Sequence, residues 1–191
     1  MKRESIRSYL KPYSISDQRK TTIAHAFASA IAPNDDYDDQ LIIQALLDIG
    51  QNPDSDLVCV YCEERPAETW DHVFGLVKNR EYAGYGHTIG NLLPICKECN
   101  SSKGNKNWRD FIQTKIKDED RLAIKVSQLE NYFMKYLGTR FDNKAIAEQC
   151  PNEMHGLLEI REQILILMKS ADEIAGKIRV KVKESGIISK P

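Results

Sequence analysis

The residues with the clearest chemistry are two closely spaced pairs of cysteines. Cys59 and Cys62 form one pair, Cys96 and Cys99 form the other, and residues 63–95 separate them. Two Cys-x-x-Cys pairs supply four thiolates for one tetrahedral Zn²⁺, although this separation exceeds the ~15–20 residues of the commonest zinc ribbons. Four protein ligands leave no open position for water, so the expected zinc is structural. A redox dithiol and a catalytic thiol are the alternatives for the same cysteines.

Further nitrogen and oxygen donors lie between the two cysteine pairs and directly after them. Asp71 and His72 are neighbours on an expected short strand, so their side chains point to opposite sides unless the strand ends or twists there. Asn91 precedes the second pair and Asn100 follows it. Each has an ordinary explanation: His72 as a hydrogen-bonded strand histidine, Asn91 as a turn residue and Asn100 as a helix cap. Their order inside one zinc frame favours a catalytic site.

The stretch DHV…NLLPICKECNSSKGNK, within its cysteine frame, resembles the HNH endonucleases, a branch of the ββα-metal nucleases, in the variant with four zinc-binding cysteines. The elements occur in the family's order: cysteine pair, Asp-His, Asn-Leu-x-Pro, cysteine pair, Asn and Lys. Asn91 and Asn100 are nine residues apart, as the second and third motif positions are in that family. The third position, often His, is Asn100 here, and the 19-residue step from His72 to Asn91 is long. The resemblance covers residues 59–108 and neither flank.

The resemblance implies a metal-dependent endonuclease that hydrolyses phosphodiester bonds of DNA. His72 would be the general base that activates water, and Asp71 and Asn100 would ligate one catalytic Mg²⁺ or Mn²⁺. Asn91 would orient His72 by bonding its imidazole or the loop around it. General chemistry agrees with these roles, because histidine has an ordinary pKa of about 6.5 and hard divalent cations prefer oxygen ligands.

Basic residues follow the expected metal site. Lys103, Lys106 and Arg109 lie shortly after Asn100 and could bind the phosphates beside the cut, which would position the substrate without reading its sequence. The alternative is a polar helix end, where the helix dipole favours lysine. His87, in the Gly-rich loop, is expected to be an exposed loop residue.

Helical signals flank this region on both sides. Capping residues, apolar periodicity and helix breakers predict helices over residues 16–32 (with Ser16 as N-cap), 38–48, 97–103, 119–137 and 152–183. We therefore expect an α+β chain that is mostly helical, with a small zinc-stapled ββα-metal core between N-terminal and C-terminal helices. The expected regions are residues 1–55, 56–110 and 111–191.

The last of these helices has the most regular apolar pattern. Its apolar residues recur at alternating steps of three and four, at Leu157, Ile160, Ile164, Leu167, Ala171, Ile174 and Ile178. A heptad pattern of this kind is typical of a helix that buries one seam against another helix. Two partners fit the pattern: a helix of the same domain, or the same helix of a second copy in a homodimer.

Composition limits the partners and the location. The 191 residues carry a net charge of −1, 41% of them are hydrophobic, and the apolar runs are too short to span a membrane. The first residues are charged rather than apolar, so we expect a cytoplasmic location, where paired cysteines favour metal over disulfides. The basic ends, which include Lys2 and Lys190, could reach a nucleic-acid backbone or simply be solvated. Cys150, remote from the pairs, is expected to be buried.

Two functions from different classes fit the sequence. The first is the HNH-like endonuclease, for which restriction, phage defence and processing of mobile DNA are suitable roles. The second is a non-catalytic zinc module that binds nucleic acid or protein. The two are separated by a set of residues that a binding module does not need: Asp71, His72, Asn91 and Asn100.

Overall fold

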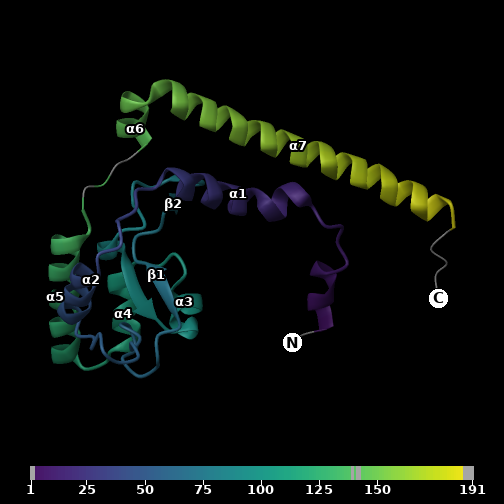
Figure 1. Cartoon of the computed structure of the whole chain (residues 1–191). Helices are drawn as coiled ribbons and strands as arrows, with labels where there is room; N and C mark the ends of the chain where they lie inside the picture. The colour runs from purple at the N-terminus through teal and green to yellow at the C-terminus, as the bar shows by residue number, and fades with distance from the viewer. Residues whose placement is uncertain (1–2, 139, 141–142, 187–191) are drawn as a thin grey trace. The chain divides into compact units, whose positions relative to one another are not determined.

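The computed structural model of the chain describes residues 3–138, 140 and 143–186 (Figure 1). The chain forms two compact units, Met1–Phe27 with Ile146–Pro191 and, separately, Ala28–Ala145. The first unit joins segments from both ends of the chain. The second contains the whole cysteine region.

A short antiparallel pair of strands lies in the Ala28–Ala145 unit. Strand β1 (Thr69–His72) pairs with β4 (Leu92–Ile95), and in their register Asp71 lies opposite Leu93. A smaller hairpin, formed by β2 (Val77–Lys78) and β3 (Glu81–Tyr82), lies in the connection between β1 and β4. The long step from His72 to Asn91 is therefore filled by a hairpin and a loop.

Helices α2 to α5 belong to the same unit. Helix α3 (Lys97–Lys103) contacts β1, while α2 (Asp39–Asp48) and α4 (Trp108–Lys115) both contact α5 (Glu119–Tyr136). Figure 1 shows α2 beside α5. Three of these helices begin at a polar side chain that accepts a backbone N–H of the first turn, which satisfies groups that lack partners within the helix. These capping residues are Asp38, Asn107 and Asp118.

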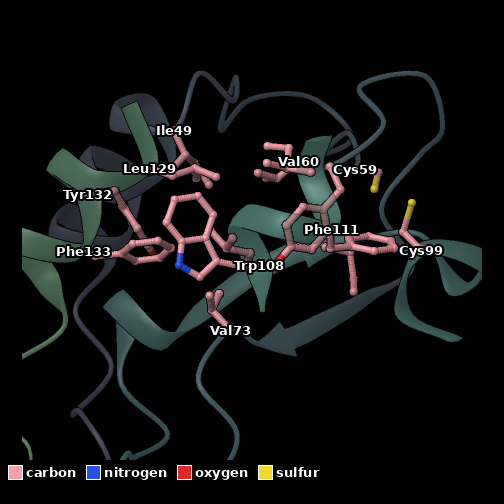
Figure 2. Packing of buried hydrophobic residues seen from close by; sticks show 14 of the residues in the cluster. Ile49, Cys59, Val60, Val73, Cys99, Trp108, Phe111, Leu129, Tyr132 and Phe133 are labelled. Atoms are coloured by element: carbon pink, nitrogen blue, oxygen red, sulfur yellow. The ribbon is translucent and has the colours of Figure 1, made fainter. Parts of the chain in front are cut away.

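One hydrophobic cluster connects the elements of this unit. Apolar side chains from α2, α4 and α5 pack with those of β4 and with the cysteines. Figure 2 shows the cluster extending from Tyr132 and Phe133, past Trp108, to Phe111 and two of the thiols. Ring centroids lie 5.1 Å apart for Trp108 and Phe133, in the edge-to-face geometry that aromatic pairs prefer. The core of this unit therefore extends beyond the region 56–110 indicated by the sequence.

The 3₁₀ turn η2 (Ile89–Asn91) holds the start of β4 against α5. The hydroxyl of Tyr132 lies within hydrogen-bond distance of the carbonyl oxygens of Ile89 and Leu92. Gly90 lies so close to the end of α5 that a Cβ atom would stand 2.2 Å from the backbone nitrogen of Leu137. Backbone at that distance cannot yield, so glycine is required here. The turn is fixed, and with it the position of Asn91.

The other unit is helical in its described part. It contains η1 (Arg3–Ser8), the first part of α1 (Ile15–Ile31) and the long helix α7 (Pro151–Glu184), which follows α6 (Asn143–Gln149). Lys2 and Lys190, two of the basic residues noted at the ends of the chain, lie outside the described residues.

Contacts between the two ends of the chain stabilise the first turn of α1. The carboxylate of Asp172 accepts the backbone N–H groups of Ile15 at 2.6 Å and Ser16 at 3.0 Å. The hydroxyl of Ser14 accepts the N–H of Asp17 at 3.1 Å. Ser14 and Asp172 therefore cap this helix, and the expectation that Ser16 is the N-cap was wrong because the helix begins one residue earlier.

The mostly helical α+β class is confirmed, and each predicted helix lies within one residue of its observed bounds. Cys150, expected to be buried, is exposed where α7 begins. That expectation was wrong because the residue lies at a helix start, outside the apolar core. Over the part of the chain that the structure describes, each helix is too short or too polar to cross a membrane.

Candidate active site

Asp71 is a buried carboxylate held by two neighbours. It is 8% exposed, and its Oδ2 lies 2.9 Å from Nζ of Lys103 and accepts the hydroxyl of Tyr61 at 3.2 Å. A buried charge is tolerated when it is paired and hydrogen-bonded in this way. Burial, and then the charge of Asp71, raises the pKa of Tyr61, so its hydroxyl keeps the proton that it donates. Among the described residues Oδ1 of Asp71 has no hydrogen-bond partner.

Lys103 lies inside the molecule rather than on its surface. Its side chain comes from the last turn of α3, is 3% exposed, and ends at Asp71. Lys103 therefore ties α3 to β1. In this arrangement its ammonium group has no exposed face for the substrate phosphate that the sequence led us to expect.

Asn100 lies on α3, one turn before Lys103, and is half-buried. Positions i and i+3 share one face of a helix, so Asn100 belongs to the face that Lys103 anchors toward β1. Helix α3 begins at Cys96, whose Sγ accepts the N–H of Cys99 at 3.4 Å. The cysteines position the start of α3, and the ion pair with Asp71 positions its end.

His72 is the last residue of β1 and is half-buried beside a second histidine. Its Nε2 lies 2.9 Å from Nδ1 of His87, and the ring centroids are 4.9 Å apart at an interplanar angle of 75°. Burial, and then the neighbouring His87, lowers the pKa of His72, while Asp71 acts in the opposite direction. A neutral imidazole near pH 7 is what a general base requires. The expectation that His87 is an exposed loop residue was wrong, since it packs against His72.

Asn91 is fully buried and organises the loop between β1 and β4. Its Oδ1 accepts the N–H of Phe74 at 2.8 Å. Its Nδ2 donates to the carbonyl oxygens of Phe74 at 3.0 Å and Gly86 at 2.9 Å. The first of these residues closely follows His72 and the second precedes His87. Of the two contacts considered for Asn91, imidazole or loop, the structure contains those with the loop.

The four paired cysteines converge on one point. Their sulfur atoms all lie within 4.8 Å of one another. A tetrahedral Zn²⁺ with Zn–S bonds of about 2.3 Å sets the sulfur atoms about 3.8 Å apart, so a slight contraction completes the site. Burial raises the pKa of the thiols of Cys59 and Cys99, so a bound cation is what would hold them as thiolates. The group fits a metal ion such as zinc and leaves no ligand position for substrate.

Lys106 and Arg109 lie on the surface beyond α3. Lys106 is exposed, and its ammonium group donates to the carbonyl oxygen of Ser102 at 2.7 Å. Arg109 pairs with Glu130, and its guanidinium group lies 5.2 Å from the ring centroid of Trp108. Exposed ion pairs contribute little and exchange readily with other anions. Both cations remain accessible to a polyanion.

Sequence reasoning missed two residues that contact the expected site. Tyr61 stands between the cysteines of the first pair, where the metal-binding spacing gives no sign that its hydroxyl reaches Asp71. His87 is 15 residues from His72, and no motif links the two. Only the folded loop brings these side chains to Asp71 and His72.

Comparison with curated proteins and with solved structures gave no significant match. Residues 59–106 match the family model described as HNH endonuclease. The match begins at Cys59 and includes both cysteine pairs, the Asp71–His72 dipeptide and the helix that carries Asn100. The chain therefore contains an HNH endonuclease domain over residues 59–106, and its function is of the nuclease type, related to nucleic acid.

Proposed function

We propose that the protein is a metal-dependent endonuclease that hydrolyses phosphodiester bonds of DNA. One observation supports this most directly: the carboxylate of Asp71 is anchored through Oδ2 while Oδ1 has no partner among the described residues. An anchored carboxylate with one available oxygen is a suitable ligand for a hard divalent cation. His72, the next residue, ends the same strand.

The roles follow from the chemistry of the side chains. His72 removes a proton from the attacking water, because its lowered pKa keeps it neutral near pH 7. Oδ1 of Asp71 and the amide oxygen of Asn100 are the protein ligands for Mg²⁺ or Mn²⁺. A divalent ion bound there supplies positive charge that stabilises the developing phosphorane-like transition state. Asn91 holds the loop that borders His72.

The basic residues divide into two roles. Lys106 and Arg109 are exposed and bind the phosphates that flank the cut. Lys103 instead orients the carboxylate of Asp71 from inside the molecule. This assignment replaces the phosphate contact expected for Lys103, because a side chain that is 3% exposed cannot meet a substrate without leaving its partner.

The cysteine cluster has a structural role in this proposal. It takes Zn²⁺ through the thiolates of Cys59, Cys62, Cys96 and Cys99, and it holds the start of α3 beside β1. Soft sulfur ligands select zinc for this site, whereas the oxygen ligands of Asp71 and Asn100 suit magnesium or manganese.

A second function, a non-catalytic zinc module that binds nucleic acid or protein, is favoured by one observation. Asp71 is already satisfied by Lys103 and Tyr61, as a purely structural carboxylate would be. The hydrogen-bonded pair of His72 and His87 has no evident use in such a module, so we prefer the nuclease.

Conversion of supercoiled plasmid in Mg²⁺ or Mn²⁺ tests the proposal, with His72→Ala as the matched variant. We expect the wild type to nick the plasmid and the variant to lose this activity while keeping its zinc, since His72 is no thiolate ligand. Equal cutting by both would show that His72 is not the base. Absence of cutting by both, with retained plasmid binding, would support the binding module.

We also propose that α7 pairs with α7 of a second copy. In one chain the apolar seam of this helix leaves four residues largely exposed, at Ile160 (54%), Leu167 (68%), Ile174 (58%) and Ile178 (56%). Light scattering should give twice the single-chain mass of 21.8 kDa. Leu167→Lys should give the single-chain mass, whereas Ile166→Lys, on the exposed but different face next to it, should not. A single-chain mass for the wild type would overturn the pairing.

A further inference from the structure

A second histidine lies against the expected general base. Nδ1 of His87 is 2.9 Å from Nε2 of His72, and both rings are half-buried. One of these nitrogen atoms must donate a proton to the other. The direction of this hydrogen bond decides which nitrogen of His72 has a free lone pair.

His87 is held firmly from the segment before α2. Its backbone N–H donates to the carbonyl oxygen of Pro33 at 2.8 Å, and its own carbonyl oxygen accepts the N–H of Asp35 at 3.3 Å. The carboxylate of Asp35 also accepts the N–H of Ile89 at 2.7 Å. A Cβ atom on Gly86 would lie 2.2 Å from the oxygen of Pro33, so the two segments touch at backbone distance. The ring of His87 is therefore presented to His72 by a fixed backbone.

Only one direction of the hydrogen bond is compatible with a basic His72. If Nε2 of His72 donates, its Nδ1 keeps a lone pair, and among the described residues that atom has no hydrogen-bond partner. When Nδ1 takes a proton from water, Nε2 still donates to His87, so the same acceptor serves both protonation states. If His87 donates instead, both nitrogens of neutral His72 are engaged and it has no free lone pair.

We infer that His87 is a positioning residue, which accepts the Nε2 proton of His72 and so leaves Nδ1 of His72 as the atom that takes the proton from water. The inference rests on the proposed nuclease function for its consequence, but the hydrogen bond itself exists independently of activity. His87 acts through His72 and needs no contact with the substrate. The arrangement corresponds to the base-and-orienter pairs of hydrolases, with a neutral imidazole as the orienter.

The direction of the hydrogen bond can be measured without any reaction. Long-range ¹H–¹⁵N correlation spectra of the zinc-loaded chain, labelled with ¹⁵N-histidine and recorded at a pH where the imidazoles are neutral, distinguish the two tautomers. We expect a protonated Nε2 and an unprotonated Nδ1 for His72, assigned by comparison with His72→Ala. A protonated Nδ1 on His72 would overturn the inference.

Kinetics test the consequence, with two substitutions at the same position. His87→Ala should lower kcat for plasmid nicking roughly 10- to 100-fold and change KM little, as is typical when a partner that orients a reactive histidine is removed. His87→Asn should restore most of kcat, because its Oδ1 can accept where Nδ1 did. Equal losses in both variants, or full activity of His87→Ala, would overturn the inference. If the wild type never cuts, the proposed function fails, and the tautomer of His72 still decides the direction of the hydrogen bond.

Discussion

At the scale of single residues, the site depends on a buried ion pair that the sequence does not reveal. Lys103 and Asp71 are 3% and 8% exposed, and the hydroxyl of Tyr61 completes the contact. Removing one partner of a buried pair leaves the other charge without compensation, which costs more than the pair itself contributes. The stability of the β1–α3 contact should therefore be sensitive to either partner.

Lys103→Met tests this sensitivity, because methionine keeps much of the length of the side chain and removes the charge. We expect the free energy of unfolding to fall by about 3–5 kcal/mol in urea titrations. The double variant Lys103→Met with Asp71→Asn should recover part of the loss, since no unpaired charge remains. Lys106→Met is the control, because that lysine is exposed and surface substitutions usually change stability by less than about 0.5 kcal/mol. Similar losses at Lys103 and Lys106 would contradict the structural role.

The sequence identifies the residues of the site better than it identifies their contacts. The order of Asp71, His72, Asn91 and Asn100 within the cysteine frame led to the HNH endonuclease domain, which the family match confirms. The contacts of Lys103 and His87 could not be predicted. Lysine after a short helix is usually a solvated helix end, and a histidine in a Gly-rich loop is usually exposed. Both residues turn inward because the loop and α3 close over β1.

At the scale of elements, the cysteines determine whether β1 and α3 stay together. The first pair lies before β1 and the second lies at the start of α3, and their four sulfur atoms converge. A structural zinc contributes its binding energy directly to folding. This unit should therefore be much less stable without its metal.

Cys59→Ser should abolish stoichiometric zinc binding and lower the thermal midpoint of the chain. The reason is that three thiolates and a hydroxyl form a weaker and more open site than four thiolates. Atomic emission measures zinc per chain, and circular dichroism follows unfolding. Cys150→Ser is the matched control, because Cys150 is exposed and lies outside the cluster, so we expect one zinc and an unchanged midpoint. Retention of one zinc by Cys59→Ser would contradict the assignment.

Gly86→Ala tests the contact between the loop and the segment before α2. The added methyl group would lie 2.2 Å from the oxygen of Pro33, which accepts the N–H of His87, so one of the two segments must move. We expect a loss of about 1–3 kcal/mol in unfolding free energy and a lower nicking rate, since His87 moves with its backbone. Gly75→Ala is the control, because its nearest neighbour, the oxygen of Val77, would be 3.8 Å away. Equal stability of the two variants would argue against a rigid contact.

The helices were predictable because local signals define them. Asp38 and Asp118 cap two of them, and apolar periodicity marks the longest. The β2–β3 hairpin was not predicted. It has only two residues in each strand, and its turn consists of Asn79 and Arg80, both with positive φ, without the glycine that usually marks such turns. Strands this short carry too few residues for an alternating pattern to appear.

At the scale of the whole molecule, the chain is organised around contacts between distant segments. Asp172 and the start of α1 are more than 150 residues apart, yet they join the two ends of the chain in one unit. No local pattern predicts such a pairing, because a carboxylate in the middle of a helix usually faces solvent. The capped turn of α1 therefore depends on α7, and it should depend on the charge of Asp172.

Asp172 should make stability depend on pH in a defined window. Hydrogen bonds from the backbone N–H groups of Ser16 and Ile15 lower the pKa of Asp172 to about 2, from an ordinary value of 3.8. A carboxylate with a lowered pKa contributes stability that is fully present above 3.8 and is lost as the pH falls toward 2. Asp172→Asn should therefore be less stable than the wild type at pH 7, and the difference should narrow steadily below about pH 4.

Urea unfolding followed by helical circular dichroism, repeated between pH 7 and pH 2, measures this difference. Subtracting the two chains at each pH removes the acid loss of zinc, which both share. Glu173→Gln is the matched control, because it removes the same charge from the next, exposed position of α7, outside the cap of α1. We expect no pH-dependent difference between that variant and the wild type over the same range. A difference between Asp172→Asn and the wild type that stays constant from pH 7 to pH 2 would show that the charge of Asp172 does not stabilise α1, and that the two ends of the chain are joined by packing alone.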